Sequence, residues 1–166
     1  MPVVLHEAST FRRCTLLCLP LIFRNWNELV LVPYRLAMWC VHFSALICVA
    51  RGSDRMIRVS SLPCDYAEAD YLFLRQITSL CLAVSFLCLF FNLWGVVTAR
   101  TLRFGADNWL QGSCHGAAAV LLILSWQATA HVACVWHVFY FFSMIPTGIE
   151  AIALAHSYWR GADFFG

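Results

Sequence analysis

The residue whose chemistry is least expected in this sequence is Glu150, which lies in the apolar segment FFSMIPTGIEAIALAH. An ionised carboxylate is costly in lipid, so such a residue usually faces other helices and finds a partner there. Trp136, Tyr140, Ser143, Thr147 and Glu150 follow a spacing of four, three, four and three residues, which predicts a single helix face. We therefore expect the carboxyl group to belong to a polar stripe that faces the inside of a helix bundle.

Pro146 lies four residues before Glu150 and leaves the carbonyl of Phe142 without its helical donor, which predicts a kink. Two interpretations stay open. In one, Pro146 and Glu150 shape and hold a bundle; in the other, they line a path for protons or ions. Because a path needs titratable groups at several depths, and the sequence offers one such glutamate and scattered histidines, the structural interpretation is favoured.

A second pattern is formed by Gly112 and Gly116, which are four residues apart and followed by three alanines. Small residues at this spacing let membrane helices approach closely. His115 lies beside this face and Asn92 lies in the preceding apolar segment, and both can form hydrogen bonds to other helices. The candidate residues for helix packing and interaction are therefore Gly112, Gly116, His115, Asn92, Ser143, Pro146, Thr147 and Glu150.

Other kinds of site find less support. His42 and His115 are the pair that a haem held between two helices would use, whereas Cys114 and His115 cannot form a metal pair, because neighbours on a helix point about 100° apart. The sequence contains no phosphate-binding loop, dinucleotide-binding glycine pattern, activated nucleophile or zinc-protease motif. We expect no catalytic residues, no cofactor and no metal.

The elements that must position these residues are four long apolar segments. The chain has 166 residues, of which 61% are hydrophobic and 12% charged, whereas a soluble domain has about a quarter charged residues. The segments cover about 30–50, 71–97, 109–126 and 136–156, and each is near the roughly 20 residues that a helix needs to cross a bilayer. The sequence therefore predicts an all-α membrane protein, a four-transmembrane-helix bundle with short loops.

The expected organisation is a transmembrane domain at 29–160, between an N-terminal cytoplasmic extension at 1–28 and a short cytoplasmic tail at 161–166. The segment RRCTLLCLPLIF in the extension is too short to span a membrane and is predicted to be interfacial. Arg51–Asp70 is predicted to be the longest loop, and Gly105–Asn108 a polar turn.

Charge placement gives the expected orientation. More arginines flank the N-terminal, second-loop and C-terminal side than the other side, so the positive-inside rule puts both termini in the cytoplasm. Arg35, just inside the first span, is expected to extend its guanidinium to the headgroups. The basic residues are few and scattered, so we expect no nucleic-acid partner. The nine cysteines mostly lie in apolar runs and predict no disulfide framework.

Several of these motifs resemble the transmembrane protein 107 family. The most specific is WHVFYFFS, followed by Pro146 and then Glu150; GSCHGAAAVLLILSW, VPYRLAMW, LPCDYAEADY and FNLWGV add to it. The resemblance covers about Val32 to Leu154. The sequence differs from the family pattern at Asn92, where the family tends to carry an acidic residue, and in the order of Cys114 and His115.

The resemblance implies a four-helix protein of the ciliary transition zone with both termini in the cytoplasm. It implies a non-enzymatic scaffold subunit that contributes to cilium assembly and to the ciliary membrane diffusion barrier. The implied partners are the lipid bilayer and other membrane proteins of the Meckel-syndrome module, namely tectonic-like and small transmembrane subunits. Two alternatives stay open: a small proton- or ion-coupled transport subunit that uses Glu150, and a haem-bearing bundle.

Overall fold

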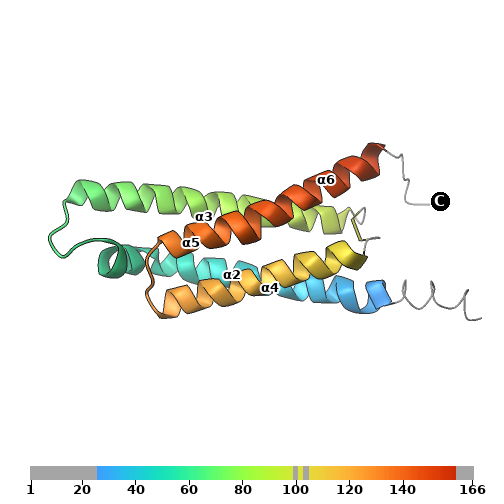
Figure 1. The fold of residues 1–166 in the computed structure, drawn as a ribbon, viewed down its shortest axis with the longest axis horizontal. Coiled ribbons are helices and arrows are strands. Elements are labelled where there is room, and N and C mark those ends of the chain that lie inside the picture. Colours follow the sequence, from blue (N-terminus) through green and yellow to red (C-terminus); the bar gives the residue numbers. More distant parts are fainter. Residues whose placement is uncertain (1–25, 99–100, 103–104, 160–166) are drawn as a thin grey trace, which may run out of the picture.

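The computed structural model describes residues 26–98, 101–102 and 105–159, which form four antiparallel helical rods (Figure 1). The first rod joins the π-helical turn η1 (Asn27–Leu31), α2 (Val32–Met56) and a second π-helical turn, η2 (Ile57–Ser61). The second and third rods are α3 (Glu68–Val97) and α4 (Gly105–Gln127). The last rod joins α5 (Ala133–Phe139), the π-helical turn η3 (Tyr140–Met144) and α6 (Ile145–Trp159).

The prediction of an all-helical membrane protein is confirmed, with one part left open. Three of the rods, Asn27–Ser61, Glu68–Val97 and Ala133–Trp159, are long and apolar enough to cross a membrane. The helix α4 is not among them, because the polar side chains in its first half lower its hydropathy. Four spans therefore stay a prediction, for which α4 is the element in question.

The predicted loop at Arg51–Asp70 is wrong in its first half. The helix continues to Ser61, and only residues 62–67 lie outside a helix. Met56 and Ile57 are 1% and 0% exposed, so apolar burial continues past the charged residues and keeps the chain helical there.

The boundary predicted at residue 28 also moves. Asn27 is already helical and is 8% exposed, so it belongs to the bundle rather than to an extension. The RRCTLLCLPLIF segment and the tail at 161–166 lie outside the described residues.

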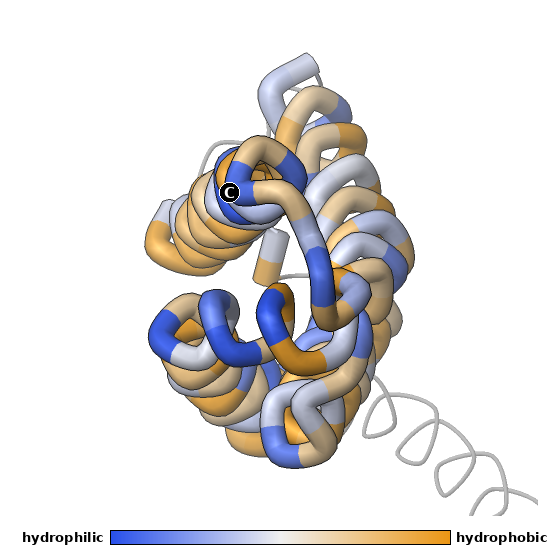
Figure 2. Tube along the Cα trace, turned by 90° about the vertical axis from the view of Figure 1, so that its left-hand side faces the viewer, coloured by the Kyte–Doolittle hydropathy of each residue, from blue (hydrophilic) through white to orange (hydrophobic). Residues whose placement is uncertain are grey.

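Buried positions recur every seven residues along each rod, which is the spacing of helices that lie nearly parallel with interlocking side chains. The positions are Arg35, His42, Val49 and Met56 on α2; Tyr71, Thr78, Ser85 and Asn92 on α3; Asn108, His115 and Leu122 on α4; and Ser143, Glu150 and Ser157 on the last rod. Figure 2, which looks along the bundle from the η2 end, shows the rods around one interior: α2 packs on α3 and α4, and the last rod lies between α3 and α4.

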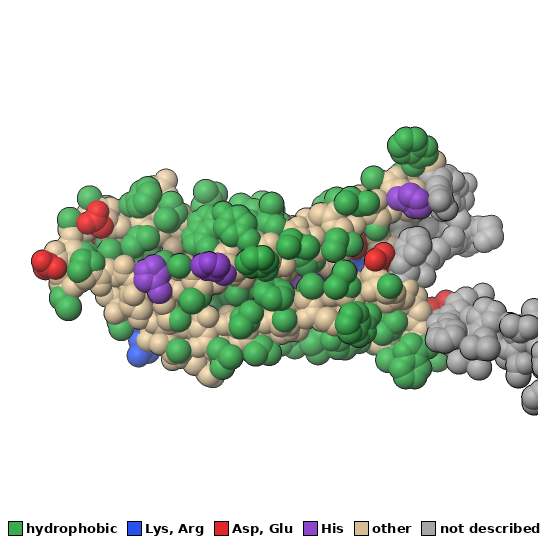
Figure 3. Space-filling view, viewed as in Figure 1, with side chains coloured by type: hydrophobic (Ala, Val, Ile, Leu, Met, Phe, Trp, Pro, Cys, Tyr) green, Lys and Arg blue, Asp and Glu red, His purple; other side chains and the backbone are tan. Residues whose placement is uncertain are grey.

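The outer surface of the bundle is apolar. Leu80, Leu87 and Trp94 on α3 are 61%, 68% and 62% exposed, and similar side chains project from the other rods. In Figure 3 hydrophobic side chains cover the visible face along its length, while acidic side chains appear at the two ends. Polar groups inside and apolar groups outside suit a protein whose solvent is lipid.

Candidate functional site: a buried ion pair and its network

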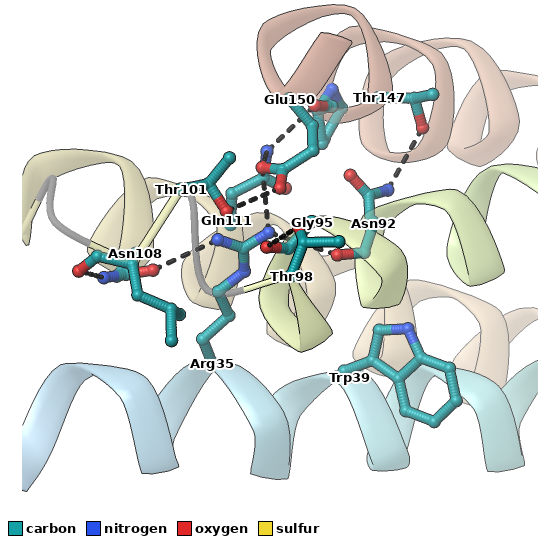
Figure 4. A network of polar contacts seen from close by, with 12 residues as sticks. Arg35, Trp39, Asn92, Gly95, Thr98, Thr101, Asn108, Gln111, Thr147 and Glu150 are labelled. Carbon is teal, nitrogen blue, oxygen red and sulfur yellow. Dashed lines mark hydrogen bonds and ion pairs between the residues drawn. The ribbon is translucent and has the colours of Figure 1, made fainter. Parts of the chain in front are cut away.

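An ion pair between Arg35 and Glu150 lies in the interior of the bundle (Figure 4). The Arg35 Nη2 atom lies 2.9 Å from the Glu150 Oε2 atom, and the two side chains are 2% and 1% exposed. The prediction that Arg35 extends to the headgroups is therefore wrong. A buried carboxylate of opposite charge holds the guanidinium inside, and the pair joins the first and last rods across 115 positions of sequence.

Both carboxylate oxygens of Glu150 are bound. Oε2 also accepts a 3.4 Å hydrogen bond from Nε2 of Gln111, and Oε1 accepts a 2.8 Å bond from Oγ1 of Thr101. Gly95 on α3 makes room for this carboxylate, because a Cβ atom there would lie 1.6 Å from Oε1. The carboxylate therefore fits only against a glycine, in the FNLWGV motif.

The Arg35 guanidinium has further acceptors. Nη1 donates to Oδ1 of Asn108 at 3.1 Å, and Nη2 donates to the backbone carbonyl of Asn92 at 3.4 Å. A buried ion pair overcomes the cost of leaving water only when additional hydrogen bonds satisfy its remaining donors and acceptors. Both ends of this pair have such bonds, so its charges are well compensated.

Asn108 extends the network to the start of the first rod. Its Nδ2 atom donates to Oδ1 of Asn27 at 2.9 Å and to the carbonyl of Leu102 at 3.0 Å, and Asn27 Nδ2 donates to the same carbonyl at 2.6 Å. The predicted polar turn at Gly105–Asn108 is therefore wrong. These residues form the first turn of α4, because Asn108 is fully buried and bound inside the bundle.

Asn92 and Thr147 join α3 to the last rod. The Asn92 Nδ2 atom donates to the hydroxyl of Thr147 at 3.1 Å and to the carbonyl of Cys88 at 3.0 Å. Thr147 in turn donates to the carbonyl of Ser143 at 2.6 Å. Ser143, Thr147 and Glu150 thus lie on the interior side, next to Asn92.

Tyr140, by contrast, does not belong to the interior stripe that its spacing predicts, since it is 53% exposed. The cause is η3, because a π-helical turn takes more residues than an α-helical turn and shifts the register of what precedes it. The turn ends just before Pro146. The Pro146 carbonyl accepts a 2.9 Å hydrogen bond from Gln111 Nε2, so the irregular backbone is joined to α4.

The small residues of α4 pack against α2. A Cβ atom on Gly112 would lie 2.5 Å from the Tyr34 ring and 3.4 Å from the Arg35 Cα atom, and one on Gly116 would lie 3.1 Å from the Met38 sulfur. The close helix contact expected from the sequence is therefore formed between α4 and α2 of the same molecule. It brings α4 near enough for Asn108 to reach Arg35.

His115 lies on α4 one turn beyond Gln111 and faces His42 of α2. Their Nδ1 atoms are 3.1 Å apart, and the rings are 1% and 0% exposed. This separation suits a hydrogen bond. Two nitrogens that bind one metal from opposite sides lie about 4 Å apart, so the geometry does not suit a haem between these rings.

Sequence reasoning missed six residues of the network: Arg35 as a partner, Asn27, Gly95, Thr101, Asn108 and Gln111. A signal for two of them was present, because Asn108, Gln111 and His115 follow a spacing of three and four residues on one apolar helix. Nothing local distinguishes Gly95 or Thr101, whose roles depend on where the Glu150 side chain lies.

The arrangement is suited to holding helices together. Hydrogen-bond donors already occupy both oxygens of Glu150, and the opposite charge of Arg35 stabilises the carboxylate. Within the described residues, no group of three or more His, Cys, Asp or Glu side chains is placed to hold a metal ion.

The comparison with known families agrees with this architecture. A sequence model of the TMEM107 transmembrane protein family matches residues 31–154, which include the ion pair, the network apart from Asn27, and most of each of the four rods. No curated protein and no solved structure gives a match. Since the matched region is most of the chain, the chain belongs to the TMEM107 family, and the resemblance seen in its motifs is confirmed.

Proposed function

We propose that this member of the TMEM107 family is a non-enzymatic scaffold subunit of the ciliary transition zone, where it contributes to cilium assembly and to the membrane diffusion barrier. Its partners are other membrane proteins of the Meckel-syndrome module, including tectonic-like and small transmembrane subunits. The family membership supports the membrane part of this proposal directly, and the ciliary part follows from what the family resemblance implies.

The observation that carries the scaffold role is the distribution of polar groups. The Arg35–Glu150 pair and its hydrogen bonds lie inside the bundle, while the outward faces of the rods are apolar. The described part of the chain offers mainly its lateral faces, because the connections between its rods are short. Lateral association in lipid is driven by close packing between proteins and by the entropy of the lipids that are released, and apolar faces can take part in such packing.

The network makes those lateral faces rigid. Arg35, Asn108 and Asn92 connect the first, third and second rods, and Glu150 and Thr147 connect the last. Fixed rods present a constant surface to a neighbouring protein, so less conformational freedom is lost when the two associate. The transport alternative receives less support, because the Glu150 carboxylate already has partners on both oxygens.

The proposed orientation puts both termini in the cytoplasm. The start of the first rod and the end of the last rod lie at the same end of the bundle (Figure 1), as an even number of crossings requires. An N-glycosylation acceptor in a polar insert within residues 62–67 should be glycosylated. The same insert between Val97 and Gly105 should not be, and the reverse pattern would contradict the orientation.

Localisation tests the function itself. A tagged copy in a ciliated cell, viewed against a basal-body marker, should form a narrow band just distal to the basal body. Even signal over the plasma membrane or an internal organelle would refute the transition-zone proposal.

A further inference from the structure

The His42–His115 pair is buried and titratable, and the network around Glu150 does not use it. The ring centroids are 5.3 Å apart, the planes are tilted by 46°, and the two Nδ1 atoms face each other at 3.1 Å. A neutral imidazole has one N–H donor and one acceptor nitrogen. Across this contact one ring therefore donates and the other accepts, so the pair shares one proton.

The outer nitrogens of the two rings are unpaired. Neither His42 Nε2 nor His115 Nε2 has a hydrogen-bond partner among the described residues, although both atoms are buried. Because the inner nitrogens share one proton, one outer nitrogen is an N–H donor and the other is an acceptor. A buried donor or acceptor that is left unsatisfied destabilises a fold, so each of these atoms favours a small polar molecule as a hydrogen-bond partner.

The chemistry of the pair favours water over a metal ion. A metal ion held between the two Nδ1 atoms would need them about 4 Å apart, and they lie 3.1 Å apart. No third ligand is available within the described residues either. Buried water, in contrast, typically bridges polar groups that lack partners.

A polar route leads from Glu150 to the histidines. Gln111 contacts Glu150 with its Nε2 atom, and its Oε1 atom is buried without a partner in the described chain. His115 follows one helical turn later, about 6 Å further along α4. The Oδ1 atom of Asn92 is likewise buried and unpaired. Buried polar atoms without hydrogen-bond partners in the described chain thus lie both beside Glu150 and at the histidine pair.

The route ends at the histidines, because the interior beyond them is apolar. Towards η2 the fully buried side chains are Leu46, Val49, Met56, Ile57, Leu122 and Val135. Thr78 provides a buried hydroxyl on α3 in this half, but no buried polar side chain of α2 or α4 lies beside it to continue a chain of hydrogen bonds.

The charged and titratable groups around the pair are few in the described interior. On α2 the nearest is Arg35, two turns away, and on the last rod it is Glu150, to which Arg35 is bound. The helix α3 contributes the buried thiols of Cys81 and Cys88, and α4 contributes the half-buried thiol of Cys114 and, in its first turn, Asp107.

We propose that the His42–His115 pair is an internal proton-exchange site, hydrated from the Glu150 end of the bundle and closed by apolar residues at the η2 end. A proton from water binds the outer acceptor nitrogen of one ring. That ring passes its Nδ1 proton across the 3.1 Å contact, and the second ring releases its Nε2 proton to water. One proton enters, one leaves, and the two rings exchange roles.

The test is solid-state NMR of the native chain in liposomes, with histidine labelled by ¹⁵N. A correlation between the two Nδ1 signals identifies the pair without any mutation. Polarisation from water should reach these ring nitrogens as it reaches those of exposed His156, while the methyl groups of buried Leu122 receive none. When the liposomes are transferred into D₂O, the ring N–H signals should disappear while the Val49 amide signal persists.

A pair of variants tests the route. Gln111→Leu should keep the Nδ1–Nδ1 correlation and lose the water transfer, whereas Gln127→Leu, the same change at an exposed position of α4, should alter neither. If the ring nitrogens of the native chain receive no polarisation from water, the exchange site is refuted, whatever the variants do. If Gln111→Leu keeps full transfer, the route from Glu150 is refuted.

Discussion

The two halves of the bundle interior differ in chemistry although the same four rods build them. At the end that holds Asn27 and Trp159, the buried positions carry Arg35, Asn108 and Glu150, and hydrogen bonds join every rod. At the η2 end, the buried positions of α2 and α4 carry Val49, Met56 and Leu122, which only pack. We expect the polar half to decide which rods are neighbours, and the apolar half to add packing contacts between them.

This division follows from lipid as the solvent. Apolar side chains gain little by leaving lipid for a protein interior, since lipid tails are as apolar as leucine. Apolar packing alone therefore discriminates weakly among possible neighbours. A buried ion pair discriminates strongly, because a charge without its partner is expensive. We expect the polar half to fix the arrangement of the rods and the apolar half to add stability.

The largest expected effect breaks the ion pair. Arg35→Met or Glu150→Leu leaves one buried charge unpaired and should lower the free energy of unfolding by about 3–5 kcal/mol. The double variant removes both charges and should be more stable than either single variant. Unfolding of the detergent-solubilised protein by SDS measures all three. Additive losses would show that the two side chains do not act as a pair.

A cavity in the apolar half should come next. Leu122→Ala removes a side chain that is 1% exposed and should lower the free energy of unfolding by less than the about 2–5 kcal/mol typical of a soluble core, because in lipid mainly the cavity and its lost packing contacts count. Leu124→Ala, two residues away and 56% exposed, is the matched control and should change the same unfolding curve little. Equal losses at the two positions would mean that Leu122 packs no better than a lipid-facing residue.

Gly95→Ala tests the space that the polar half requires. The added methyl group would displace the Glu150 carboxylate from Thr101, and an overpacked site of this kind typically costs about 1–3 kcal/mol. Gly148→Ala places the same group in open space and should be neutral or slightly stabilising, because alanine favours helix. The thermal unfolding midpoints of the two variants should therefore move in different directions or by clearly different amounts.

The smallest effect is expected from one hydrogen bond of the network. Thr147→Val removes the acceptor of Asn92 Nδ2 and should cost about 0.6 kcal/mol, the average for such bonds between membrane helices. Ser44→Ala removes an exposed hydroxyl that bonds within its own helix, and it serves as the control. A loss at Thr147 as large as that at Glu150 would mean that the bond does more than join two helices.

Much of this architecture follows from the sequence, and the exceptions have physical causes. The apolar segments predict the helices, but not that the first continues to Ser61, since burial of Met56 and Ile57 depends on the neighbouring rods. The stripe through Ser143, Thr147 and Glu150 is visible in the spacing. Tyr140 was misplaced because no local rule announces the π-helical turn η3. The snorkelling arginine was wrong because the same residue suits either environment until its partner is known.

The sequence by itself determined that the chain is helical, that it belongs in a membrane, that it is a member of the TMEM107 family, and that Glu150 would need a partner inside the bundle. These conclusions depend on composition, local spacing and motifs, which any single segment carries. Only the tertiary structure decided that the partner is Arg35, that Gly95 makes room for the carboxylate, and that His42 meets His115. Each of those contacts joins residues far apart in the sequence, so it forms only when the rods pack against one another in this arrangement.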